Sequence, residues 1–405
     1  MDSLINAAAR SLALGDPVQA LKLIALRSDA AGLALRGIAM AQLGELARAR
    51  ELLRSAARAF SPREAMARAR CIVAEAEIAL VSRDLTWTGR ALETARGTLD
   101  KHGDRVNALH ARTLEIRRLL LIGRLDEAER ALHRLPSAVP EVFRISHELI
   151  AAGIALRRIE PGRARDALLR AREAARRVAV PALAAEVESA FKSLDAPAAR
   201  IFSRGTDRPA TLDDVAALLA TDALIVDDCR HLVRQGRMRI ALGRRPVLLS
   251  LVRALARAWP GDVTRDELVA HAFRLSLADE SNRARLRVEI GRLRRLLGAH
   301  ATIEATDRGF VLKPARAREV AVIARLVEGK HGDVLALLGD GEAWSTSALA
   351  QALDVGQRTV QRALDELALE GKVQPVGRGR SRRWLTPPAA GFTTVLLLPA
   401  ALPVD

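Results

Sequence analysis

Apolar residues recur at three- and four-residue steps from Ser3 to about Lys192, a spacing that places them along one side of an α-helix. Ala47, Leu52, Leu53, Ala56 and Ala57, for example, share one broad stripe. Ala, Leu, Arg and Glu, which form helices well, dominate this part of the chain, and Gly and Pro are few. The pattern predicts that residues 1–200 form an array of amphipathic helices.

A short phrase recurs in this part and predicts tight turns between paired helices. Leu14-Gly15-Asp16 precedes Ala20, and similar phrases precede Ala49, Ala128 and Ala164, so the gaps between these alanines are 29, 79 and 36 residues. These gaps fit units in the mid-thirties, with one degenerate unit in the longest gap. Phrase and period resemble tetratricopeptide repeats, although the aromatic positions of that repeat are mostly missing.

The resemblance implies a superhelical array with a concave surface, and such surfaces usually bind partners. We therefore expect a sensor or docking domain for a peptide or protein ligand. The alternative is a structural or dimerising helical array. If the array dimerises, the protein is a homodimer.

The pattern changes after residue 200. Gly205 and Pro209 indicate a linker within 201–221, and Thr211 with Asp214 predicts the capped start of a short helix there. Short β-branched and alternating runs then predict a small antiparallel sheet at 224–242. Helical periodicity returns, and 302–313 predicts two strands joined at Gly309; the expected helices span 246–259, 264–273 and 282–297.

This order resembles the OmpR/PhoB-type winged-helix DNA-binding domain over residues 222–314. Pro260 to Leu268 resembles the start of its second helix, Val288 to Leu297 its recognition helix, and Asp307 to Phe310 its wing tip. The resemblance implies binding of double-stranded DNA. RNA polymerase is a further candidate partner because the family's second helix and following loop contact it in some members; here that loop contains Asp279 and Glu280, so no role is assigned to it.

The helical wheel of 282–297 supports this interpretation independently. Leu286, Ile290, Leu293 and Leu297 fall on one side and predict the packed face. The opposite side carries small residues, including Gly291 where the family often has a basic residue, and arginines flank it. Such a face suits the major groove. The DNA contacts that we expect in this domain are Arg285, Arg287, Arg292, Arg294, Arg295 and Arg308.

Leu224 to Asp228 looks like the first strand of a response-regulator receiver, whose paired aspartates hold magnesium. A receiver also needs a later phosphoacceptor, a lysine and repeated βα units, and none of these follows. A receiver is therefore excluded.

A second winged helix–turn–helix is predicted at 315–387, resembling bacterial regulators in general. Val360, Ala363, Leu364 and Leu367 predict its packed face. The DNA contacts expected here are Gln357, Arg358, Gln361 and Arg362 on the helix, with Arg378, Arg380, Arg382 and Arg383 on the wing. The alternative is a degenerate winged helix that contacts protein. Residues 388–405 form an apolar tail.

Composition narrows the classes of function. The chain has 405 residues and a net charge of +16, which favours a polyanionic partner. Aromatic residues make up 3%, without tyrosine, which argues against a reader of single strands by base stacking. Two cysteines, scattered histidines and the absence of phosphate-binding or catalytic motifs predict no metal, no cofactor and no enzyme. No apolar run is long enough for a membrane span, so a cytoplasmic location is expected.

The sequence thus predicts a mainly α protein with an N-terminal α-solenoid and two small α+β winged helices. Its expected function is sequence-specific regulation of transcription on double-stranded DNA. Two alternatives remain: a non-catalytic adaptor that assembles proteins, and a phosphorelay output whose receiver lies on another chain.

Overall fold

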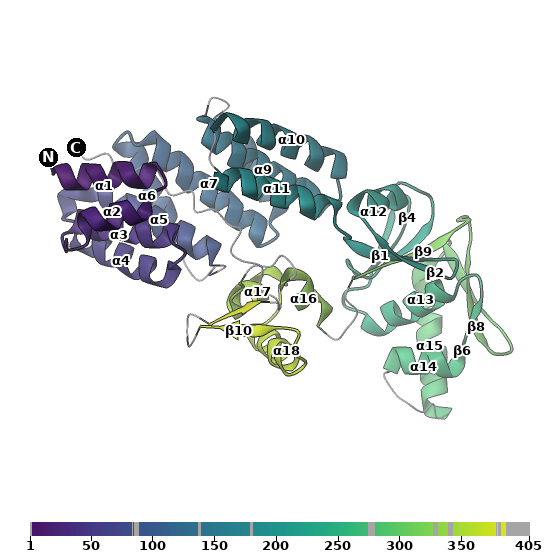
Figure 1. The fold of residues 1–405 in the computed structure, drawn as a ribbon. Helices are drawn as coiled ribbons and strands as arrows, with labels where there is room; N and C mark the ends of the chain where they lie inside the picture. The colour runs from purple at the N-terminus through teal and green to yellow at the C-terminus, as the bar shows by residue number, and fades with distance from the viewer. Residues whose placement is uncertain are drawn as a thin grey trace. The chain divides into compact units, whose positions relative to one another are not determined.

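The computed structural model shows a mainly helical protein in which every strand of the described residues follows residue 198 (Figure 1). It describes residues 2–82, 84, 89–136, 139–178, 181–273, 280–326, 331–338, 343–377, 379 and 382–385. The chain forms two compact units. The first comprises the residues up to Ala155, Arg163–Phe191 and the residues from Asp333 onward; the second comprises Leu156–Gly162 and Lys192–Gly332.

Consecutive helices pack against each other in the helical array, as the periodicity predicts. The expected turns are present: Gly15, Gly44 and Gly123 adopt positive φ angles between helices, and Ile159 does so where the phrase has no glycine. The helices are α1 Ser3–Ala13, α2 Pro17–Ile24, α3 Ala30–Gln42, α4 Leu46–Ala59, α5 Ala65–Val81, α6 Gly89–Lys101, α7 Arg105–Leu121, α8 Leu125–His133, α9 Glu141–Arg158, α10 Pro161–Val178 and α11 Pro181–Asp195, with a short 3₁₀ turn at Pro62–Glu64.

The alanine after each phrase packs inside the array. Ala20, Ala49, Ala128 and Ala164 are all 0% exposed, so a larger side chain at any of them would push the paired helices apart. The 79-residue gap holds the additional pair α5 and α6, whose connection lies mostly outside the described residues.

A six-stranded mixed sheet forms much of the second unit, with strand order β2-β1-β9-β3-β4-β5. β3 pairs with β9 in parallel, and the other pairings are antiparallel. The strands are β1 Ala199–Ser203, β2 Thr206–Ala210, β3 Leu224–Asp227, β4 Leu232–Gln235, β5 Met238–Ala241 and β9 Val320–Ala324.

This sheet corrects two expectations. Residues 201–221 are more than a linker: they include most of the hairpin β1–β2, followed by the expected capped helix α12 (Leu212–Leu219). The sheet also extends past residue 314, because the apolar strand β9 inserts between β1 and β3. Leu224 and Val226 face one core while Ile225 faces another, and burial on both faces explains why the first three residues of β3 are all apolar.

The rest of the second unit follows the order helix, strand, helix, helix, strand, strand. Its elements are α13 Pro246–Ala258, β6 Asp262–Thr264, α14 Arg265–Phe273, α15 Glu280–Leu297, β7 Ala301–Ala305 and β8 Gly309–Pro314. The three strands form a small sheet in the order β6-β8-β7. We call residues 246–314 the central module.

The C-terminal residues of the first unit repeat this order on a smaller scale. They form α16 Gly332–Leu338, α17 Thr346–Ala352, α18 Gln357–Leu369, β10 Gln374–Val376 and β11 Arg383–Leu385. Trp344 takes the place of the first strand, since its backbone pairs with that of Trp384 through N–O distances of 2.8 and 2.7 Å. We call residues 332–385 the C-terminal module. The predicted apolar tail lies outside the described residues.

No helix in the described ranges is long and apolar enough to cross a membrane.

Candidate nucleic-acid interface

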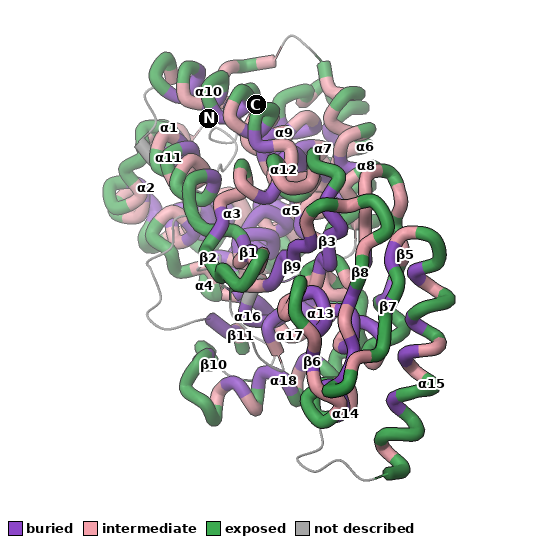
Figure 2. The backbone as a smooth tube through the Cα atoms, turned by 90° about the vertical axis from the view of Figure 1, so that its right-hand side faces the viewer, coloured by how far each residue is buried: buried purple, intermediate pink, exposed green. Residues whose placement is uncertain are grey.

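Helix α15 separates an apolar seam from a charged face. Leu286, Ile290, Leu293 and Leu297 are at most 1% exposed and pack on α13, α14 and the small sheet, as the helical wheel predicts. Figure 2 shows buried and exposed colours alternating along this helix. On the other face Val288 is 54% exposed, and nothing lies within 4 Å of the Cβ position of Gly291. This face is open, and the absence of a side chain at Gly291 lets another surface approach the helix backbone closely.

Reciprocal hydrogen bonds between Thr264 and Glu267 cap the start of helix α14, next to the small sheet. The backbone N–H of Thr264 donates to the Glu267 carboxylate at 3.0 Å, and the N–H of Glu267 donates to the Thr264 hydroxyl at 3.3 Å. The Thr264 hydroxyl also donates to this carboxylate, at 2.7 Å, and this bond, followed by the backbone bond, holds the pKa of Glu267 below its usual value. The capping box expected from the sequence is therefore confirmed.

The β7–β8 hairpin, which corresponds to the expected wing, is held against α14 and α15 by two arginines. Arg265 donates to the backbone oxygens of Thr306 and Asp307 at 3.0 and 2.8 Å, and Arg294 donates to that of Ile303 at 2.6 Å. Both guanidinium groups lie near the ring of Phe310. Arg294, expected as a DNA contact, thus orients the hairpin, and Arg265 is a positioning residue that the sequence did not reveal.

Gly309 fixes how closely the hairpin approaches β6. It pairs with Thr264, and a Cβ atom at Gly309 would stand 1.8 Å from the backbone oxygen of Val263. Only glycine fits there.

Three of the remaining arginines on α15 are exposed, but the exposure of the groups that they contact differs. Arg287 pairs with Glu280 at 3.2 Å, Arg292 with Glu289 at 2.7 Å, and Arg285 lies over the ring of Phe273. The Glu280 side chain is 76% exposed, so its pair with Arg287 contributes little to stability and a phosphate can replace this carboxylate at low cost. Glu289 is 13% exposed, so drawing Arg292 away leaves a largely buried carboxylate without this partner.

Two further arginines have unmatched charge. Arg295 near the end of α15 and Arg308 at the hairpin tip are exposed, and neither has a carboxylate within ion-pair distance in the described part of the chain. The central module therefore presents Arg287, Arg292, Arg295 and Arg308 to solvent.

Helix α18 of the C-terminal module has the same division. Val360, Ala363, Leu364 and Leu367 are at most 3% exposed, as predicted. Gln357, Arg358 and Arg362 are exposed. Gln361 is occupied: its amide oxygen accepts from Thr346 at 3.2 Å and its amide nitrogen donates to Asp365 at 2.8 Å. These two bonds fix the orientation of its amide and leave one N–H and one oxygen lone pair for a further contact.

The four arginines expected on the second wing do not act alike. Arg378 and Arg380 lie outside the described residues. Arg382 is exposed, with its guanidinium 4.4 Å from the ring centre of Trp384. Arg383 is only 12% exposed and turns to the helical array, donating to the backbone oxygen of Ser82 at 2.8 Å and lying 3.4 Å from Asp84. Arg383 is therefore a structural residue here, which corrects the expected DNA contact.

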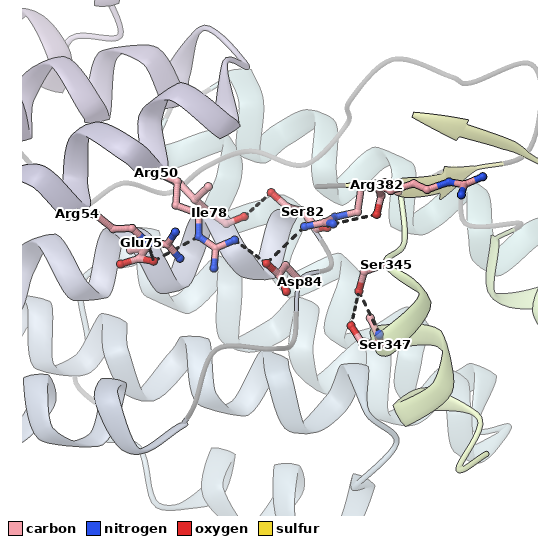
Figure 3. Close-up of polar contacts among 11 residues, drawn as sticks. Arg50, Arg54, Glu75, Ile78, Ser82, Asp84, Ser345, Ser347 and Arg382 are labelled. Carbon is pink, nitrogen blue, oxygen red and sulfur yellow. Dashed lines mark hydrogen bonds and ion pairs between the residues drawn. The ribbon is translucent and has the colours of Figure 1, made fainter. Parts of the chain in front are cut away.

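Asp84 belongs to a chain of charged contacts within the first unit (Figure 3). Arg50 contacts Asp84 at 2.5 Å and Glu75 at 3.3 Å, and Arg54 contacts Glu75 at 2.6 Å. Burial lowers the pKa of Arg383, against the opposing charge of Asp84. The chain of contacts ties the base of the C-terminal hairpin to α4 and α5. No local sequence signal indicates this arrangement.

Comparison of the chain with models of protein families, with curated proteins and with solved structures found no match in any of the three.

Proposed function

We propose that the protein is a sequence-specific, double-stranded DNA-binding regulator of transcription. In this proposal the array is a tetratricopeptide-like sensor or docking domain, the central module is an OmpR/PhoB-like winged helix, and the C-terminal module is a second winged helix–turn–helix. The shared element order of the two modules supports this assignment, because a helix pair followed by a hairpin is the arrangement of winged-helix DNA readers.

The observation that carries the proposal is the outer face of α15. Four buried apolar residues lock one side of the helix, while Arg287, Arg292 and Arg295 project around the open surface at Gly291. A major groove accepts one α-helix, and arginine donates two hydrogen bonds to the edge of guanine. Small side chains let the helix backbone come close enough for these contacts.

The β7–β8 hairpin would supply a second contact with DNA. Arg265 and Arg294 hold its backbone, and Arg308 is exposed at its tip. A cation on such a tip is attracted to the narrow minor groove beside the recognition helix. The two contacts together would fix the register of the module on DNA.

Salt dependence tests the electrostatic part of the proposal. Each phosphate that the protein neutralises releases counterions, so with about six phosphates the affinity should fall about a thousandfold between about 50 and 200 mM salt. Fluorescence anisotropy with a labelled duplex measures this fall. An affinity that does not change with salt would reject phosphate binding.

A charge reversal at Gly291 tests the face itself. Gly291→Glu fits the open space and removes a helix-interior glycine, so we expect the fold to be retained and duplex affinity to fall at least tenfold. Gly97→Glu on α6 is the matched control, because Gly97 is also helical with nothing within 4 Å of its Cβ position. Equal affinity of the two variants would mean that α15 does not face DNA.

One observation favours a second candidate function, a protein-assembly adaptor. The C-terminal hairpin uses Arg383 to contact the array, which is protein recognition by a winged-helix-like module. An adaptor would elute from a column free of nucleic acid and would not shift a random duplex pool. Selection of bound fragments from that pool separates the two functions and, for a regulator, yields the recognised sequence.

A further inference from the structure

The helical array contains a cavity of about 360 Å³ lined by α6, α7 and the end of α8. Leu92, Ala111 and Ile116 form an apolar wall, and each is at most 2% exposed. Pockets for small ligands commonly have volumes of about 300–1,000 Å³ and a mostly apolar lining with a few polar groups. The cavity meets both conditions. The residues that line it belong to the array, although Leu92 and Ala111 also pack in one core with residues of the C-terminal module.

Some of the charged residues around the cavity already neutralise one another. Arg96 pairs with Glu93 and, at 2.8 Å, with Asp100; Arg112 also pairs with Asp100, at 3.2 Å. Arg134 differs from them. It lines the cavity, is exposed, and has no carboxylate within ion-pair distance among the residues that the structure describes.

Glu115 is the complementary group on the same cavity. Its Oε1 accepts a long bond of 3.4 Å from Arg118, while its Oε2 is buried without a hydrogen-bond partner. Burial raises the pKa of this carboxyl, against the charge of Arg118. A hydrogen-bond donor that enters the cavity would relieve the cost of this unmatched acceptor.

We propose that this cavity binds an apolar amino acid or dipeptide as its zwitterion. The ligand's ammonium group would donate to Glu115, its carboxylate would accept from Arg134, and its side chain would pack against Leu92 and Ile116. An ammonium group carries three donors and a guanidinium binds a carboxylate through paired hydrogen bonds, so the two ends are recognised by different groups. The inference rests on the proposed function only in naming what the sensor domain senses; binding itself needs no DNA.

Isothermal titration of the full chain without DNA tests the proposal. We expect saturable binding of L-leucine, L-phenylalanine or L-leucyl-L-leucine. Leucinamide, which lacks the carboxylate, and 4-methylpentanoate, which lacks the amine, should bind at least about tenfold more weakly, since each loses a charge-assisted hydrogen bond. No binding of any of the three zwitterions at about 10 mM, or equal binding of the truncated compounds, would overturn the proposal.

Variants locate the site. Arg134→Ala and Glu115→Gln should each weaken zwitterion binding about tenfold, and Ala131→Leu should block it by filling the cavity. Arg130→Ala is the matched control: Arg130 lies in the last turn of α8, Arg134 directly follows that helix, and Arg130 does not line the cavity. Binding unaffected by all three cavity variants would place the ligand elsewhere and overturn the assignment. The same preparations titrated with duplex report DNA binding separately, so failure of either proposal leaves the other testable.

Discussion

The central and C-terminal modules share one order of elements but stabilise their hairpins differently. The central module braces its hairpin internally, through Arg265 and Arg294, within a unit that also contains the six-stranded sheet. The C-terminal module has a two-stranded sheet and one backbone bridge, and its hairpin uses Arg383 to contact the array. Arginines therefore differ in role within each module: Arg294 and Arg383 donate to backbone oxygens of the protein, while Arg308 and Arg382 are exposed.

This difference shows that basic residues on a hairpin do not by themselves indicate contact with nucleic acid. Exposure and the availability of a carboxylate decide what an arginine does. Among the described residues of the β7–β8 and β10–β11 hairpins, only Arg308 and Arg382 are exposed arginines. The four predictions below separate the modules, beginning with the largest expected effect.

The strongest test removes the candidate DNA contacts of one module at a time. Arg292→Ala with Arg295→Ala should lower duplex affinity by about a hundredfold or more, because each lost contact to a base or phosphate costs about 1–3 kcal/mol. Arg358→Ala with Arg362→Ala should act similarly only if the C-terminal module also binds DNA. Fluorescence anisotropy measures both, with Arg48→Ala and Arg58→Ala on the array as the charge-matched control. If the central pair binds like the control, the central module is not the reader.

Replacing a glycine by alanine should lower the stability of the two hairpins by different amounts. Gly309→Ala should destabilise the central module by at least about 3 kcal/mol, since the new Cβ would overlap the Val263 backbone oxygen. Gly379→Ala has open space and only a positive φ of 56° to strain, so about 1 kcal/mol is expected. Hydrogen exchange of peptides from 262–314 and 343–377 reports each module. Similar protection in both variants would contradict the close approach of β6 and β8.

The charged link to the array provides the third test. Asp84→Asn should destabilise the first unit by about 2 kcal/mol, because Arg50 and Arg383 lose a carboxylate that is 11% exposed. Arg383→Ala should likewise destabilise the unit while leaving duplex affinity unchanged. Urea unfolding and DNA titration measure the two effects, and Arg382→Ala is the exposed neighbour for comparison. A larger loss of affinity with Arg383→Ala than with Arg382→Ala would restore Arg383 as a DNA contact.

Of the second helices of the two modules, only that of the central module should respond to acid at its first residues. Hydrogen bonds from Thr264 lower the pKa of Glu267, so its stabilising contribution is present above the ordinary value of 4.5 and is lost as pH falls below it. The cap of α17 is the Ser345 hydroxyl, which carries no charge that changes with pH, so this cap adds no pH dependence. The effect is under about 1 kcal/mol, as for other caps. Exchange protection of α14 at pH 4 and 7 should differ in wild type and depend less on pH in Glu267→Gln, whose side chain stays neutral but still accepts hydrogen bonds. An equal pH effect in wild type and Glu267→Gln would exclude the cap as its source.

Much of the architecture follows from local pattern. The helix pairs, the buried alanines after each phrase, the cap at Thr264 and the packed faces of α15 and α18 all depend on residues within one or two helical turns of each other. Periodicity and capping chemistry act over that distance, which is why they could be predicted from the sequence. The interpretation as a DNA-binding regulator stays a prediction.

The tertiary structure alone decided the pairings between distant residues. β9 joins the sheet beside β3 across about a hundred residues of intervening chain, and Arg383 meets Ser82 across 301 residues. A guanidinium in the sequence has the same charge and the same flanking residues whether it meets a phosphate or a buried carboxylate. Which of these it contacts depends on what the folded chain places beside it. The energy of an ion pair or of a strand pairing depends on distance in space, and neither produces a periodic pattern along the chain.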